Sequence, residues 1–222
     1  MDKKAKFFRR VVANIVIVLV LSGTAAYVAF GKAAPASSDI QPVYNGFSDN
    51  HVSLMVNVHQ NTPYVDDILH IFSENGVQTT FFTAGIWVSE NSPTLKKMFS
   101  LGHEIANHGY FQKDHKRLSA ARTREEITLT HEIVKKTIGI EMNLFAPPLG
   151  SYSSQTVSAA KSLGYTTILW SKELTPSFNS DTVRGGDLIL VQPNRSTVDM
   201  LDRTIKIIKA RGLSITPVSA VL

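Results

Sequence analysis

Histidine and carboxylate side chains gather around the segment GHEIANHGY. His108 ends what reads as a short strand, and Asp114 and His115 follow in the next loop. His59 stands two residues past Asn57, at the end of an earlier apolar run, and so shares a strand face with that residue. Neutral imidazoles and carboxylates are ordinary zinc ligands, and a catalytic zinc site uses three of them. The sequence therefore allows a metal site formed by His59, His108 and either Asp114 or His115.

The same side chains fit a second interpretation, in which they are ordinary polar residues of loops. Their spacing matches no familiar metal-ligand pattern, and His108 can be explained as a hydrogen-bonded histidine that packs at a strand end. His70 and His131 lie within helical patterns and are expected to be solvated. From the residues alone, both interpretations of the first group remain open.

Short apolar runs of strand type alternate along the chain with longer stretches of helical period. Strands are predicted at 52–58, 79–83, 104–107, 143–145, 166–170, 187–191 and 213–216. Helices are predicted at 92–100, 123–138, 153–163 and 197–210, with a further one from Thr62-Pro63 to Gly76. Thr123 and Glu126 form a capping-box pattern at the start of the helix at 123–138. This alternation is typical of parallel strands joined by right-handed crossovers.

The predicted fold is α/β, a small irregular (β/α) barrel of about seven parallel strands. A glycine-rich nucleotide loop after the first strand would favour a doubly wound sheet, and the sequence has none there. In a parallel barrel, functional groups gather at the carboxyl ends of the strands, which we call the mouth. The predicted strand ends carry Asn57, Thr83, His108, Ala146, Ser171 and Gln192.

The first thirty residues have the pattern of a membrane signal-anchor. Residues 1–10 hold five Lys or Arg and one Asp, and residues 11–30 are almost entirely apolar. As a helix, twenty residues span about 30 Å, the thickness of a bilayer's hydrocarbon core. We predict a cytoplasmic tail at 1–10, a transmembrane helix at 11–30, a tether at 31–46 and an extracytoplasmic barrel at 47–222. Ala34-Pro35-Ala36 also resembles a signal cleavage site, so secretion after cleavage is the alternative.

The charge of the chain is concentrated in that tail. The net charge is +5, and residues 1–10 hold five positive charges and one negative, so only +1 remains for residues 11–222. A nucleic-acid-binding domain carries a basic patch, and the folded part has no charge excess to form one. The chain has no cysteine, so the predicted outer domain uses no disulfides.

Four segments, in this order, resemble the polysaccharide deacetylases, the NodB-homology or carbohydrate esterase family 4 group. They are TTFFTAGIWVSENSP, GHEIANHGY, PPLGSY and SLGYTTILWS, and the resemblance covers nearly all of residues 52–218. It implies zinc-dependent removal of an N-acetyl group from a chitin-like or peptidoglycan glycan. In that chemistry one Asp and two His bind the metal, a second Asp is the general base, a late His is the general acid and an Arg holds the catalytic Asp.

Carried over by position, the resemblance implies that the reactive groups are replaced. Asn57 stands for the base, and an amide does not accept a proton near neutral pH. Val58 stands for the metal-binding Asp and has no lone pair. His108 is kept, but Gln112 stands for the second metal-binding His, and its neutral oxygen suits zinc poorly. Ala146 occupies the position of the family's Arg, and Gln192 occupies the position of its final His. No metal is therefore expected at this site.

The leading hypothesis is a membrane-anchored envelope protein that has lost its catalysis and binds glycan or an envelope protein. Tyr110, Phe111 and Tyr152 are the glycan-binding candidates, with loop residues that cover the barrel core as the other interpretation. One alternative is an active N-deacetylase with zinc at the relocated site of His59, His108, Asp114 and His115. Another is an envelope or spore assembly factor without glycan contact. The resemblance to deacetylase-like proteins of spore-forming bacteria implies a cell-wall or sporulation context.

Overall fold

A computed structural model describes residues 41–222 of the chain. The predicted tail, the predicted transmembrane helix at 11–30 and most of the predicted tether lie outside the described residues. From residue 41 onward, no helix has both the length and the apolar character needed to span a bilayer.

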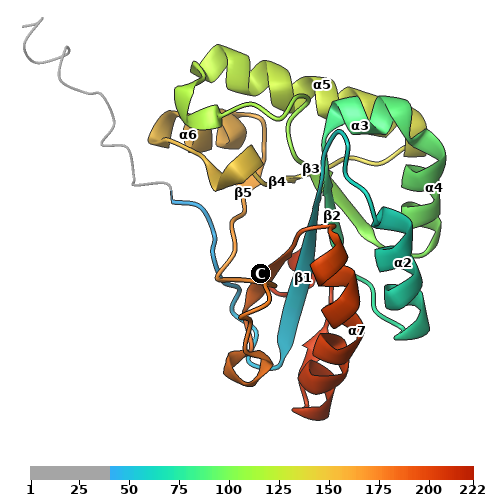
Figure 1. Cartoon of the computed structure of the whole chain (residues 1–222). Helices are drawn as coiled ribbons and strands as arrows, with labels where there is room; N and C mark the ends of the chain where they lie inside the picture. The colour runs from blue at the N-terminus through green and yellow to red at the C-terminus, as the bar shows by residue number, and fades with distance from the viewer. Residues whose placement is uncertain (1–40) are drawn as a thin grey trace, which may run out of the picture. The chain divides into compact units, whose positions relative to one another are not determined.

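The strands form one parallel sheet that curves into a half-barrel (Figure 1). They are β1 (His51–Val58), β2 (Thr80–Thr83), β3 (Glu104–Asn107), β4 (Leu144–Phe145), β5 (Thr166–Thr167), β6 (Lys172–Glu173), β7 (Leu188–Val191) and β8 (Ser214–Ile215). Their order is β5-β4-β3-β2-β1-β7-β6, and β8 pairs with β1. The prediction of a parallel α/β barrel is thus confirmed as a half-barrel. The sequence did not predict β6, because a two-residue charged strand has no apolar run to mark it.

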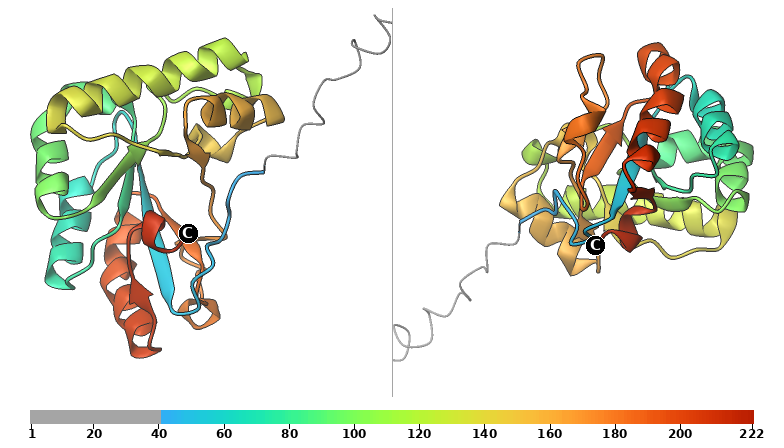
Figure 2. Two further views of the ribbon diagram at one scale, coloured as in Figure 1. Left: turned by 180° about the vertical axis from the view of Figure 1, so that it is seen from behind. Right: turned by 90° about the horizontal axis from the view of Figure 1, so that it is seen from below.

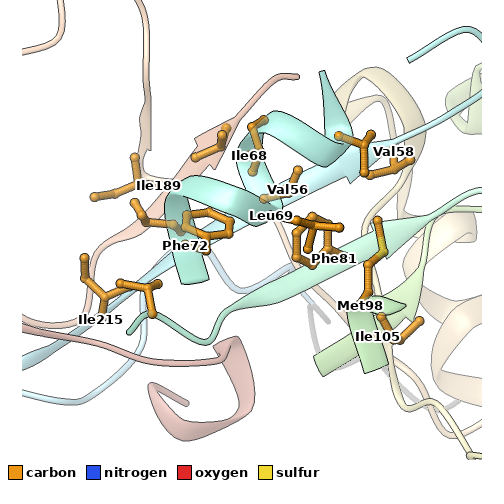
Figure 3. Packing of buried hydrophobic residues seen from close by; sticks show 14 of the residues in the cluster. Val56, Val58, Ile68, Leu69, Phe72, Phe81, Met98, Ile105, Ile189 and Ile215 are labelled. Carbon is orange, nitrogen blue, oxygen red and sulfur yellow. The ribbon is translucent and has the colours of Figure 1, made fainter. Parts of the chain in front are cut away.

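The central strand β1 separates two apolar layers. Met55 packs inside the barrel with Phe82 and Leu190. Val56 and Val58 point the other way, into the layer under the helices, as Figure 3 shows. Strands buried on both faces read as continuous apolar runs, which explains why β1 could be found in the sequence. Because side chains alternate along a strand, Asn57 faces inward, like Met55.

Helices cover the outer face of the sheet (Figures 1 and 2). They are α2 (Val65–Glu74), α3 (Gly85–Glu90), α4 (Ser92–Ser100), α5 (Ala120–Ile138), α6 (Ser154–Ser162) and α7 (Arg195–Ala210). The predicted capping box at Thr123 is wrong, because α5 begins three residues earlier and the Ser119 hydroxyl accepts from Arg122 N, at 3.3 Å. The short helix α3 was not predicted, since six residues show too little of a helical period.

The segment just before β1 fills the open side of the half-barrel (Figure 2). Val43 N donates to Thr167 O at 2.9 Å, and Leu169 N donates to Val43 O at 2.8 Å. Asn45 forms a second bridge, to Asp187. The domain therefore begins before the predicted boundary at residue 47, with chain that the sequence assigned to the tether.

Candidate functional site

His108 lies at the mouth, directly after β3, and is almost fully buried. Its Nδ1 donates to the Ala146 carbonyl at 2.7 Å, since a carbonyl oxygen only accepts. Burial lowers the pKa of His108 to about 3 against the opposing effect of that bond, and the neighbouring imidazoles of His59 and His115 lower it further. His108 is therefore neutral at physiological pH, with the lone pair on Nε2.

The end of β1 presents no group that can donate charge or bind a proton. Asn57 is buried, and within residues 41–222 its Oδ1 has no hydrogen-bond partner. Val58 is 0% exposed and belongs to the apolar layer with Ile68 and Leu69. A buried amide oxygen without a partner costs about 1–3 kcal/mol. This strand end therefore has an unmet hydrogen-bond acceptor on its inner face and only packing on its outer face.

The remaining positions implied by the resemblance lie on different parts of the mouth. Gln112 is exposed in the loop after β3, and Gln192, after β7, is half-buried. Ala146 is fully buried inside the barrel, where its carbonyl serves His108. The side chain of Ala146 carries no polar atom, so it can orient no neighbouring carboxylate.

The four residues of the relocated metal site have other roles. The ring of His115 is fully buried against Phe145, with centroids 5.2 Å apart, and neither of its nitrogens has a partner among the described residues. Burial lowers the pKa of His115 to about 4. His59 Nδ1 bonds the backbone oxygen of Gln60 at 2.9 Å. Across residues 41–222, no three His, Asp or Glu side chains form a group that could hold a metal ion.

Asp114 joins the two loops that flank His108. Its carboxylate accepts from the Ser151 hydroxyl at 2.6 Å and from Lys116 N at 3.1 Å, and Arg117 lies 3.2 Å away. The bond from Ser151 is the main cause of the lowered pKa of Asp114. The loop after β3 and the segment that precedes α6 are therefore held together at the mouth.

A buried carboxylate holds the backbone of two of the glycan-binding candidates. Glu126 of α5 accepts from Tyr110 N at 2.9 Å and from Phe111 N at 2.7 Å. The Tyr110 and Phe111 rings meet edge to face at 4.8 Å, and Phe111 remains 43% exposed. Lys113 Nζ lies 5.5 Å from the Phe111 centroid. Glu126 thus fixes the turn that exposes an aromatic ring, a role that its predicted place in a helix cap did not reveal.

A second group of large side chains lies on the segment between β4 and α6 and on the residues before β1. The Tyr152 and Tyr44 hydroxyls are 2.9 Å apart, and this hydrogen bond, with burial, raises the pKa of Tyr44 to about 12. Leu149 has φ 60° and is 69% exposed. Beside it, Gly150 has φ 63°, and a Cβ there would lie 2.7 Å from the Trp170 ring. We call Tyr44, Tyr110, Phe111, Leu149 and Tyr152 the rim.

A chain of hydrogen bonds supports the turn after His108 from below. His131, which was predicted to be solvated, is half-buried: its Nε2 lies 2.6 Å from Glu141 and its Nδ1 lies 2.5 Å from the Tyr165 hydroxyl. Asn107 Nδ2 donates to that hydroxyl at 3.3 Å, and Asn107 Oδ1 accepts from Gly109 N at 2.9 Å. The contacts are distant in sequence, which is why the helical pattern around His131 did not indicate them.

Known proteins resemble a large part of this chain, including the strands β1 to β4 and their ends. The family model described as polysaccharide deacetylase matches residues 45–168. An uncharacterized protein, YlxY of Bacillus subtilis, is 31% identical over 193 residues, which cover 82% of this chain and 60% of YlxY. The peptidoglycan-N-acetylmuramic acid deacetylase PdaA of the same organism is 32% identical over 109 residues, or 49% of this chain and 41% of PdaA. The chain thus spans less than two thirds of the length of these relatives.

A solved structure with the same fold is BA3943 from Bacillus anthracis, described as a CE4 family pseudoenzyme. It is 27% identical, with a TM-score of 0.76, and the match covers 82% of this chain and 69% of that protein. A mutant of BA3943, described as having restored enzymatic activity, is 25% identical with the same TM-score.

Proposed function

Because the chain belongs to the polysaccharide deacetylase family, we propose that it is a catalytically inactive, deacetylase-like protein of the cell envelope that binds glycan at the rim. In this proposal, residues 11–30 anchor the chain in the membrane and hold the barrel on the outer side, where wall glycan lies. Envelope proteins are the alternative partners.

The observation that carries the proposal is the chemistry at the end of β1. The two positions that the resemblance assigns to the base and to the metal-binding carboxylate hold Asn57 and Val58. Val58 is fully buried among apolar side chains, so it contributes nothing to the mouth. General acid-base help is worth about a hundred- to ten-thousand-fold per group, and this mouth lacks both the base and the acid of the family.

The residues at the ligand positions do not fit a zinc ion. Of these positions, only His108 offers a usual zinc donor, while Val58 has no lone pair and Gln112 is an exposed amide. The likeness to BA3943, itself described as a pseudoenzyme, supports an inactive member of this fold.

The rim supplies what a glycan-binding surface needs. Aromatic faces stack on the apolar faces of sugar rings, and the neighbouring hydroxyls and amides bond sugar hydroxyls. Glu126 and the link between Asp114 and Ser151 hold the rim in place before any ligand arrives, which reduces the entropy cost of binding.

Acetate release from peptidoglycan, with and without added zinc, tests the loss of catalysis. We expect none above background in either condition. Zinc-dependent acetate release that disappears in His108→Ala would overturn the proposal and favour the relocated metal site.

Co-sedimentation with insoluble peptidoglycan tests binding. We expect Phe111→Ala to lose most of the bound fraction. The control is Phe99→Ala, since Phe99 is 44% exposed, almost the same as Phe111, but lies at the end of α4, before β3 begins and so away from the mouth. Failure of the unaltered chain to co-sediment would contradict glycan binding and favour an assembly role.

Cell fractionation tests the proposed anchor. We expect the full chain in the membrane fraction and a chain lacking residues 11–30 outside it.

A further inference from the structure

We propose that a cavity beside the mouth binds one sugar unit that carries a free ammonium group, so that the protein prefers de-N-acetylated glycan. This inference rests on the proposed glycan binding and names the substrate class. The cavity measures about 310 Å³ and lies between the loop after β1 and the corner between α3 and α4. Its lining includes Tyr64, Asp66, Asp67, Trp87, Asn91 and Thr94.

The cavity lies at the same end of the barrel as the rim. The loop that contributes Tyr64 follows the carboxyl end of β1, and α3 follows the carboxyl end of β2, which pairs with β1 in parallel. Gln60 Nε2 donates to Glu90 Oε1 at 3.3 Å and so joins the two walls. Tyr64 has φ 63°, a left-handed conformation that directs the chain into α2. A glycan chain lying over the mouth can therefore extend into this cavity.

The aromatic part of the cavity suits a sugar. Trp87 is 4% exposed and lines the cavity, and its indole N–H is a hydrogen-bond donor. In this proposal a ligand hydroxyl accepts from that N–H. The half-buried ring of Tyr64 adds an apolar surface at the entrance. A side-chain donor next to aromatic rings fits a hydroxyl-rich ring better than an apolar ligand.

The charge of the cavity selects among sugars. Asp66 is paired with Lys97 at 2.7 Å, but Asp67 has no ion-pair partner between residues 41 and 222. Asn91 Nδ2 donates to Trp87 O at 3.0 Å, which leaves Asn91 Oδ1 free to accept. A carboxylate and an amide oxygen match the three donors of an ammonium group, whereas an N-acetyl group is neutral and bulkier.

Both aspartates also stand in the first turn of α2, where acidic residues favour the helix dipole. If Asp67 only stabilised the helix dipole, its replacement would leave glycan affinity unchanged. If Asp67 binds the ammonium group, its replacement weakens binding. Asp67→Asn keeps the shape and removes the charge. Tyr64→Asn removes the ring and retains a residue that accepts the left-handed conformation.

The experiment is calorimetric titration of the 41–222 domain, whose own core is described above, with glucosamine and N-acetylglucosamine tetramers in mildly acidic buffer. We expect tighter binding of the glucosamine tetramer. Asp67→Asn should weaken this binding about fivefold, the effect of losing one partly exposed ion pair, and leave the N-acetylated tetramer unchanged. Tyr64→Asn should weaken the binding of both tetramers. The control is Asp49→Asn, at an exposed position outside the cavity, which should weaken the binding of neither tetramer.

The outcomes separate the two proposals. Equal affinity of the unaltered domain for both tetramers, or an unchanged glucosamine affinity in Asp67→Asn, overturns the assignment of this cavity and leaves binding at the rim intact. If neither tetramer binds and peptidoglycan does not sediment the protein, the proposed glycan binding itself fails.

Discussion

Two strand ends of the same mouth differ in what their residues do. At the end of β1, Val58 is absorbed into the apolar layer and Asn57 keeps an unpartnered oxygen. At the end of β3, His108 and Asn107 are held by hydrogen bonds to Ala146, Tyr165 and Gly109. Under the proposed function, the first end lacks the base and the metal-binding carboxylate of the family, whereas the second keeps residues that maintain the shape of the mouth. On that proposal the mouth is suited to binding rather than to turnover.

Returning a carboxylate to the end of β1 should have the largest effect. Val58→Asp places an unpaired charge in the layer under α2, so we expect the free energy of unfolding to fall by about 4 kcal/mol. Urea unfolding measures this loss. Val58→Thr has nearly the same shape without the charge and should cost less, about 1–3 kcal/mol. If Val58→Asp is as stable as the parent and binds zinc, the contrast between the two strand ends is wrong.

Removing the support of the β3 end should have the next largest effect. Glu126→Ala leaves two backbone N–H groups without their carboxylate acceptor, so we expect a loss of about 3 kcal/mol together with weaker peptidoglycan binding. Thermal unfolding and co-sedimentation measure the two effects. Glu125→Ala changes the neighbouring exposed residue and should alter neither. Full glycan binding by Glu126→Ala would show that the turn needs no such support.

The buried imidazole of His115 gives a pH dependence. Its pKa is about 4 in the fold and 6.5 in the unfolded chain, so the unfolded state binds the proton more tightly. The resulting stability is present above about pH 6.5 and is lost as the pH falls toward 4. Between pH 7 and pH 5, His115→Leu should remove about 2 kcal/mol of the acid-induced loss, as urea unfolding at the two values would measure.

The acid loss has a control in a buried residue that cannot titrate. Thr123 is fully buried and carries no ionisable group, so Thr123→Val should leave the pH dependence unchanged. The same acid-induced loss in His115→Leu as in the parent would contradict the assignment, because the imidazole would then not be the group that titrates.

The smallest expected effect concerns the start of α5, the helix that carries Glu126. Ser119→Ala removes the observed cap and should cost about 1 kcal/mol in thermal unfolding. Thr123→Val should cost little, because the buried Thr123 hydroxyl has no partner among residues 41–222. The reverse ranking would restore the capping box that the sequence predicted.

The seven predicted strands could be found because parallel strands buried on both faces form apolar runs. Long-range contacts could not be found in this way. Thr123 and Glu126 have the spacing of a capping box, but the Glu126 carboxylate bonds the turn at Tyr110, 16 residues earlier. His131 likewise sits in a helical pattern while its ring joins residues from two other segments. The replaced positions at the mouth came from the resemblance, because no local pattern distinguishes Asn57 from any other amide.

The entry of the chain into the barrel wall has a mechanical consequence. Val43 is bonded through its backbone on both sides of Ile168, and the next residue, Tyr44, belongs to the rim. If the preceding residues lead to a membrane anchor, tension on them reaches the wall first at these two hydrogen bonds. Pulling on the N-terminal side would load these two hydrogen bonds first and the contact between Tyr44 and Tyr152 next. Force along the chain and binding of a wall glycan would then act on the same residues, Tyr44 and Tyr152.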